Sequence, residues 1–115
     1  MRKILMAAFL LFSTSSTYAE SGIFFDGNKL VPLLREFEKA ERHDPATNYQ
    51  SSGKYVGFVL GVHDSVAATL CIPSNVNARQ VTSIVARYFN ENPSEWSDPA
   101  SLLVLKALQK AFSCG

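Results

Sequence analysis

The sequence predicts an all-α protein, a small single-domain bundle of about four helices stapled by one disulfide. Apolar residues recur at helical spacing in four segments, no convincing strand pattern lies between them, and one cysteine follows each of the second and fourth segments. The chain has 115 residues, of which 47% are hydrophobic and 18% charged, so it has room for one domain and the composition of a globular protein.

The first nineteen residues have the layout of a secretory signal peptide. Arg2 and Lys3 give a positive start, and the apolar run that follows is shorter than the roughly 20 residues of a membrane span. A small, polar segment then ends at Ala19, where we expect cleavage. An uncleaved apolar N-terminal helix is the alternative. We therefore divide the chain into a signal peptide, residues 1–19, and a helical domain, residues 20–115, with no membrane attachment after cleavage.

Export would place Cys71 and Cys114 in an oxidising compartment, where a disulfide is the default. That bond would close a loop of about 44 residues, for which the chain-entropy model gives roughly 4 kcal/mol. Two buried free thiols are the alternative. A zinc site is not expected, because His43 and His63 do not lie at ligand spacing from either cysteine. We expect no metal and no cofactor.

The first helix is predicted from about Asn28 to Arg42. Four apolar side chains at positions i, i+3, i+4 and i+7 form its inner face: Leu30, Leu33, Leu34 and Phe37. Glu36, Glu38 and Glu41 alternate with basic residues on the other positions. This pattern indicates a solvated, ion-paired face rather than paired catalytic carboxylates. Residues 43–53 are polar and contain a proline, which predicts a loop.

The second helix is predicted from about Tyr55 to Leu70. Gly57 and Gly61 lie four residues apart on a face next to its apolar stripe. A glycine inside a helix costs about 1 kcal/mol relative to alanine. Two explanations stay open: another element packs close to the backbone there, or tertiary packing simply tolerates the glycines.

The third helix has the strongest start signal. Asn77 is expected to be its N-cap, with Gln80 as the reciprocal partner of a capping box. We expect it to end near Asn92, before a proline. The fourth helix is expected to begin with Asp98 as N-cap and Pro99 at its first position.

The fourth helix is apolar over an arc wider than one face, because Leu102 and Leu105 add to its inner stripe. Such a helix is either central to the bundle or covered by a second subunit. The stripe itself is Ala100, Leu103, Val104, Ala107, Leu108, Ala111 and Phe112. Phe24 and Phe25, just after the signal peptide, are expected in the core.

Sequence motifs for catalysis are missing, and we expect a protein that is not an enzyme. There is no nucleophile elbow, phosphate-binding glycine loop or zinc-protease motif. His-Asp occurs at His43 and His63, but a metal-dependent hydrolase needs more ligands than these. Asp64 lies on the glycine face, and since a buried carboxylate needs a partner we expect it to pair with Arg87 or Tyr88. A net charge of +1 without a basic stripe makes nucleic acid an unexpected partner.

Recognition of another protein is the remaining class of function. Trp96 lies in the polar segment Asn90–Asp98, and tryptophan is enriched at interface hot spots. The alternative is that Trp96 folds back and caps the bundle. We take Trp96, Glu95 and Asn92 as candidate partner-binding residues, and His43–Gly53 as the second candidate loop.

Several short motifs occur in a fixed order in roughly the C-terminal two thirds of the chain after the leader. They are Gly-x-x-x-Gly-Val-x-Asp at 57–64, Cys-Ile-Pro at 71–73, Asn-Pro at 92–93 and Phe-Ser-Cys at 112–114. Together they resemble the Rap/Tai family of immunity proteins, which includes immunity proteins against amidase effectors of type VI secretion. The resemblance implies a periplasmic, all-helical protein, often a homodimer, that blocks a peptidoglycan amidase by occupying its active-site cleft.

The resemblance also assigns residues. It matches the disulfide to Cys71 and Cys114, and framework positions to Gly57, Gly61, Asp64 and Pro73. Many relatives carry a second bridge, which is missing here because residues 33–37 and 50–55 contain no cysteine. We therefore expect a periplasmic inhibitor that plugs the cleft of a peptidoglycan amidase effector with a protruding loop. The alternative is a periplasmic chaperone-like or peptide-binding helical protein, without a toxin partner, that binds through apolar surface exposed when a dimer dissociates.

Overall fold

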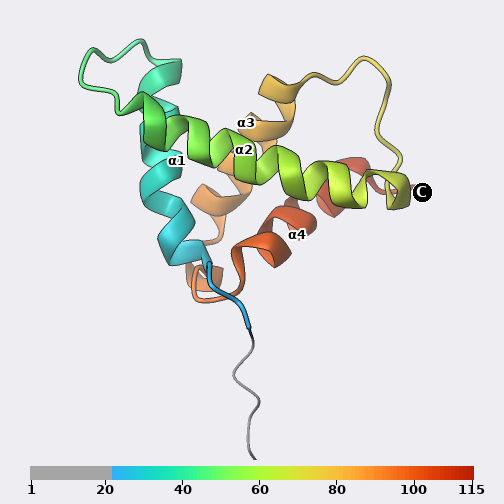
Figure 1. The fold of residues 1–115 in the computed structure, drawn as a ribbon. Helices are drawn as coiled ribbons and strands as arrows, with labels where there is room; N and C mark the ends of the chain where they lie inside the picture. Colours follow the sequence, from blue (N-terminus) through green and yellow to red (C-terminus); the bar gives the residue numbers. More distant parts are fainter. Residues whose placement is uncertain (1–21) are drawn as a thin grey trace, which may run out of the picture.

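The computed structural model describes residues 22–115, which form four α-helices joined by short connections (Figure 1). The helices are α1 (Gly27–Glu41), α2 (Tyr49–Val66), α3 (Ala78–Glu91) and α4 (Ala100–Phe112), with two short 3₁₀ segments, η1 (Ala67–Thr69) and η2 (Pro93–Glu95). An isolated bridge between Asp26 and Pro99 is the one β-type pairing in this range. The predicted all-α class is confirmed.

The predicted signal peptide lies outside the described residues. Among the helices of residues 22–115, none combines the length and the apolar character needed to cross a bilayer.

Helix α2 runs across the other three helices, and α1 lies beside α3 (Figure 1). Arg35 joins these two helices because its Nη1 donates to Asn90 Oδ1 at 2.6 Å, and Arg79 of α3 forms an ion pair with Glu41 of α1 at 2.8 Å. All four helices contribute to one core. Its most buried side chains are Leu30, Leu34, Tyr55, Val59, Val85, Phe89, Leu103, Val104 and Leu108.

Helix α2 begins at Tyr49, several residues before the predicted start, so the expected loop over residues 43–53 is wrong for its second half. The side chain of Asn48 caps the helix by accepting the backbone N–H of Ser51 at 3.0 Å. Ser52 then lies buried in line with Tyr55 and Val59. Its small and polar residues predict a loop from sequence alone, but the Asn48 cap and the packing of Ser52 make this segment helical.

The predicted capping box of α3 is confirmed. Asn77 Oδ1 accepts the backbone N–H of Gln80 at 2.9 Å, and Gln80 Oε1 accepts the backbone N–H of Asn77 at 2.8 Å. The expected cap of α4 is wrong, since Pro99 occupies the N-cap position and no side chain caps the helix. Asp98 instead uses its backbone carbonyl, which accepts the N–H of Gly27 at 2.9 Å.

The disulfide between Cys71 and Cys114 is present, as predicted, with the two Cα atoms 5.0 Å apart. The backbone N–H of Cys71 also donates to the carbonyl of Phe112 at 3.0 Å. The bond therefore ties the connection after α2 to the end of α4, with α3 inside the loop that it closes.

Helices α1, α2 and α3 meet at the buried side chain of Tyr55. Its ring packs against Phe37 with 4.8 Å between the ring centroids, and its hydroxyl donates to the carbonyl of Thr82 at 2.6 Å. Burial raises the pKa of Tyr55, so the hydroxyl remains a hydrogen-bond donor.

The start of α1 is held by the connection between α3 and α4. The carbonyls of Asp98 and Trp96 accept the N–H groups of Gly27 and Asn28 at 2.9 and 2.8 Å. These are among the helix N–H groups that have no partner within α1. A Cβ at Gly27 would lie 2.7 Å from the carbonyl oxygen of Trp96 and 2.8 Å from Leu103 Cδ1. The close approach therefore requires glycine at this position.

Two expectations about buried apolar residues, for Phe24 and for Ala111, are corrected. Phe25 packs on Phe58 with ring centroids 5.3 Å apart, but Phe24 is 89% exposed rather than in the core. Ala111 is exposed, since the apolar stripe of α4 turns away from the bundle there. Leu102 is 39% exposed, so part of the wide apolar arc of α4 is not covered by this chain.

We predict that Gly27→Ala destabilises the protein by about 2 kcal/mol, because the added methyl group overpacks against backbone atoms of Trp96. Asn28→Ala is the matched control: it places an alanine one residue further along α1, where the side chain is exposed, and should change stability by less than about 0.5 kcal/mol. Urea unfolding measures both. Equal stability of the two variants would contradict the close approach.

Candidate functional site

The connection between α1 and α2 is an ordered corner that projects from the bundle (Figure 1). Helix α1 ends in a Schellman motif, in which Asp44 N–H donates to the carbonyl of Lys39 and His43 N–H donates to the carbonyl of Ala40, both at 3.0 Å. His43 occupies the left-handed position of this motif, with φ of 56°. Glycine is the usual residue there, so His43 holds a backbone conformation that costs a side-chain-bearing residue free energy.

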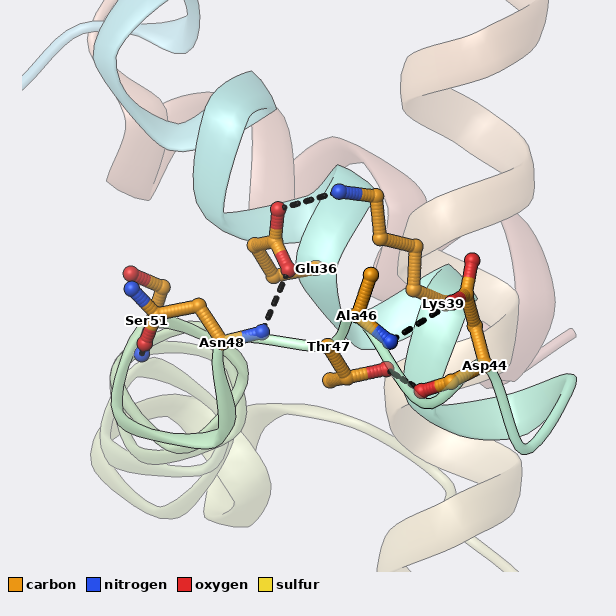
Figure 2. Close-up of polar contacts among 7 residues, drawn as sticks. All are labelled: Glu36, Lys39, Asp44, Ala46, Thr47, Asn48 and Ser51. Carbon is orange, nitrogen blue, oxygen red and sulfur yellow. Dashed lines mark hydrogen bonds and ion pairs between the residues drawn. The ribbon is translucent and has the colours of Figure 1, made fainter.

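Asp44 organises the next turn of the corner. Its Oδ1 accepts the backbone N–H of Ala46 at 2.8 Å, and its carbonyl accepts the hydroxyl of Thr47 at 2.6 Å (Figure 2). These two local hydrogen bonds stabilise the turn.

Glu36 of α1 fastens the corner to the start of α2. Its Oε1 accepts Lys39 Nζ at 2.8 Å and its Oε2 accepts the backbone N–H of Asn48 at 2.7 Å (Figure 2). The hydrogen bond from Lys39, and then that from Asn48, lower the pKa of Glu36. The predicted ion-paired face of α1 is confirmed, because Glu38 pairs with Arg35 and Glu41 pairs with Arg79.

We name four exposed residues of the braced corner, His43, Pro45, Ala46 and Tyr49, the corner tip; Arg42, Asn48 and Gln50 beside them are exposed as well. Tyr49 is 68% exposed. The tip carries no carboxylate and no lysine or arginine, and its backbone is held by the contacts described above. Such a segment presents a rigid surface of mixed apolar and polar side chains to a partner at little entropic cost.

The three candidate residues of the α3–α4 connection make contacts within the chain. Asn92 Nδ2 donates to the carbonyl of Tyr88 at 2.8 Å. Trp96 Nε1 donates to the carbonyl of Phe89 at 2.9 Å, and its ring is half-buried against the core. We call residues 92–98 the clasp loop, because they hold the start of α1.

Glu95 links the clasp loop to both neighbouring helices. Its two carboxylate oxygens accept Tyr88 Oη and Lys106 Nζ, each at 2.9 Å. The Lys106 ammonium, and then the Tyr88 hydroxyl, lower the pKa of Glu95. Burial is the main cause that raises the pKa of Tyr88, and Glu95 adds to it. These contacts hold the clasp loop against α3 and α4 and make it rigid.

The expectation for Asp64 is wrong. Its side chain is 81% exposed and its Oδ1 contacts Nδ1 of the adjacent His63 at 2.8 Å, while Tyr88 bonds to Glu95 instead of to Asp64. The reason is the orientation of α2, which directs its glycine face to solvent. Gly57 and Gly61 are exposed as well, and a Cβ on either would meet no atom within 4 Å.

The two His-Asp dipeptides lie at opposite ends of α2. His43 precedes the helix, and His63 lies in its last turn, about 20 Å along the axis from the first residue, Tyr49, at 1.5 Å per residue. Residues 22–115 contain no group of three or more His, Cys, Asp or Glu side chains that could hold a metal ion.

Sequence reasoning placed the corner tip in its second candidate loop but missed the residues that brace it. Glu36 was interpreted only as part of a charged face. The available signal was Asp44 with Thr47 and Asn48, a run of side chains that form turns and helix caps. It also missed Gly27, whose role depends on a contact with a loop far along the chain.

Comparisons with known proteins give one family. A sequence model of the Rap1a immunity proteins matches residues 26–114, which is nearly all of the described domain. Comparisons with curated proteins and with solved structures gave no match.

We predict that Glu36→Gln flattens the acid side of the stability profile. A carboxylate with a lowered pKa stabilises the folded state above its ordinary value of 4.5, and this stabilisation is lost as the pH falls through the folded-state pKa. The wild-type Tm should therefore exceed that of Glu36→Gln near neutral pH, and the two should converge in acid. Glu91→Gln is the control, since Glu91 makes no ion pair within residues 22–115.

We also predict that His43→Gly raises stability by about 1 kcal/mol, because glycine adopts the left-handed conformation without the penalty that histidine has. His43→Ala keeps that penalty and removes the imidazole, so it separates the backbone effect from the side-chain effect. Urea unfolding of both variants is the measurement. Equal stability of His43→Gly and His43→Ala would show that the conformation is not strained.

Proposed function

The chain belongs to the Rap1a immunity protein family, and from this premise we propose that it binds and inhibits a secreted peptidoglycan amidase effector. Immunity proteins act on a secreted effector. The amidase class rests on the resemblance of the ordered motifs at 57–64, 71–73, 92–93 and 112–114 to immunity proteins against such amidases.

The proposed site of action is the periplasm, where peptidoglycan lies. The disulfide between Cys71 and Cys114 supports this location, because such bonds persist in oxidising compartments. The signal-peptide layout of residues 1–19 supports it independently. An inhibitor in this compartment meets the effector before it reaches its substrate.

The corner tip is the surface we propose for the effector's cleft. The observation that carries this proposal is the set of contacts around Glu36, Asp44 and Asn48, which hold an exposed, projecting segment in one conformation. A preorganised loop loses little conformational entropy when it binds. Tyr49 supplies the aromatic anchor that interface hot spots favour.

The clasp loop, with Asn92, Glu95 and Trp96, is our second candidate surface. Its tryptophan supports a binding role, but the polar groups of all three side chains are used inside the chain. We therefore rank it behind the corner tip and expect substitutions there to change stability first.

A chaperone-like or peptide-binding role is the alternative function. The observation that favours it is an apolar groove of about 390 Å³ between α2 and α4, beside the exposed side chains of Ile23 and Leu102. A chaperone of this kind would bind many unfolded proteins, whereas an immunity protein binds one effector.

We predict that Tyr49→Ala weakens binding to the cognate amidase by about 2 kcal/mol or more, roughly 30-fold in Kd, with unchanged thermal stability. Trp96→Ala should instead lower stability by about 2 kcal/mol, because it removes a half-buried ring and a hydrogen bond. Calorimetric titration of purified amidase effectors at neutral pH, with peptidoglycan cleavage measured in parallel, gives the affinities.

Each outcome of that experiment decides a separate point. Tight binding with loss of cleavage supports the immunity role. If Tyr49→Ala binds normally and Trp96→Ala loses affinity without losing stability, the clasp loop is the inhibitory surface. No binding to any amidase, together with binding to unfolded proteins, would overturn the amidase assignment in favour of the chaperone-like role.

A further inference from the structure

Helices α3 and α4 line a groove of about 510 Å³ that contains no residue of the corner tip or of the clasp loop. Its volume lies in the range of protein pockets that take small ligands. The α3 wall consists of Ile84, Arg87, Tyr88 and Glu91, at positions i, i+3, i+4 and i+7. This spacing places all four side chains on one face of the helix, so the wall is continuous.

The α4 wall is formed by Ala107, Lys110 and Ala111, and two of these three side chains are single methyl groups. Ala107 is buried and Ala111 is exposed, so the apolar lining extends from the core to the surface. Ile84 and the ring of Tyr88 add to this lining from α3. The short alanine side chains leave room between the helices, and the apolar lining suits small apolar groups of a ligand.

Three charged side chains share the groove with these apolar groups: Arg87, Lys110 and Glu91. All three are exposed, and none makes an ion pair within residues 22–115. Arg87 and Glu91 are four residues apart on α3, a spacing at which opposite charges can pair, yet they do not. The groove therefore offers two unpaired cations and one unpaired anion beside an apolar surface.

The walls of the groove are held in place by contacts within the chain. Tyr88 Oη and Lys106 Nζ both bond to Glu95, each at 2.9 Å, which joins α3 to α4 through the clasp loop. The disulfide between Cys71 and Cys114 fixes the far end of α4. Preorganised walls reduce the entropic cost of binding a ligand. Since the hydroxyl of Tyr88 is already used, polar recognition falls to the three charged side chains.

We propose that this groove binds a stem peptide of peptidoglycan, the short acidic peptide that peptidoglycan carries on its sugar chains. Two cations and one anion are complementary to a ligand with more carboxylates than amino groups. A stem peptide has several free carboxylates, one amino group on its diamino acid, and alanine methyl groups for the apolar lining. The guanidinium of Arg87 suits bidentate binding of a carboxylate, and Glu91 suits the amino group.

The choice of peptidoglycan as the source of the peptide rests on the proposed function, because an amidase effector cleaves such peptides. The groove itself does not depend on that function, since it shares no residue with the corner tip. Peptide binding and effector binding can therefore fail separately. Tyr49→Ala should leave peptide binding unchanged.

An NMR titration of the isotope-labelled protein at neutral pH tests the site, with an N-acetylated stem tripeptide as the probe. We expect a Kd below about 1 mM and shifts that are concentrated in the groove walls of α3 and α4. Arg87→Gln and Lys110→Gln should each weaken binding about fivefold, which is the size of an exposed charge pair. Lys54→Gln removes another exposed, unpaired cation outside the groove and should change nothing.

A second titration assigns the role of Glu91. Acetylation of the free amino group on the diamino acid of the probe should weaken binding to the wild type about fivefold. The same acetylation should have no effect on binding to Glu91→Gln, because the pairing is already lost. An equal loss in both proteins would overturn the assignment of Glu91 to the amino group.

A substitution that fills the groove tests its use without removing a charge. Ala111→Leu should weaken peptide binding more than tenfold, while the Tm and the circular dichroism spectrum stay unchanged, because position 111 is exposed. Gln109→Leu adds the same side chain at an exposed position of α4 outside the groove and is the matched control.

Three outcomes overturn the proposal. The first is the absence of shifts in α3 and α4 with the stem tripeptide, whatever the protein does to an amidase. The second is equally tight binding of acetyl-Ala-Glu-Lys-Ala, an ordinary peptide with two carboxylates and one amino group, which would overturn peptidoglycan as the source. The third is loss of amidase binding in Ala111→Leu, which would make the groove part of the effector interface. Peptide binding without binding of any amidase would support the groove and overturn the proposed function alone.

Discussion

The contact between Gly27 and the backbone of Trp96 is the constraint on which the rest of the fold depends. It joins the first turn of α1 to the connection that precedes α4, so the first and last helices are fixed to each other by backbone contacts in addition to side-chain packing. The carbonyls of Trp96 and Asp98 replace the side-chain cap that the start of α1 would otherwise need beyond Asp26. In the same place the ring of Trp96 lies 5.9 Å from the guanidinium of Arg35, which also bonds to Glu38 and Asn90.

This use of the clasp loop decides which surface remains for a partner. Asn92, Glu95 and Trp96 make their hydrogen bonds within the chain, and the loop gains rigidity from them. The corner between α1 and α2 is also braced, by the side chains of Glu36, Asp44 and Asn48, and the four side chains of the corner tip remain exposed. Strain at a residue such as His43 persists only where the surroundings enforce it, and such residues gather at functional sites.

The two faces of helix α2 differ in their contribution to stability. Its inner face packs Tyr55 and Val59 into the core, where Tyr55 also bonds to α3. Its exposed face carries Gly57 and Gly61, which disfavour the helix, because glycine gives the unfolded chain more conformational freedom and leaves the backbone exposed in the helix. The disulfide and the core packing from three other helices offset this cost in the folded chain. The helical conformation at the two glycines is therefore maintained by tertiary structure.

The sequence by itself determined the helical class, the capping box at Asn77, the ion-paired face of α1 and the disulfide between Cys71 and Cys114. These features depend on the spacing of residues within a few helical turns, or on the number of cysteines. Both are properties of the linear sequence. The tertiary structure alone decided the early start of α2 at Tyr49, the exposure of Asp64 and the inward role of Trp96. Each of these depends on which side of a helix faces the core, and on contacts such as Gly27 with Trp96 that join residues far apart in the chain. Local propensity carries no information about such contacts, because the free energy that selects them comes from burial and backbone pairing in the assembled fold.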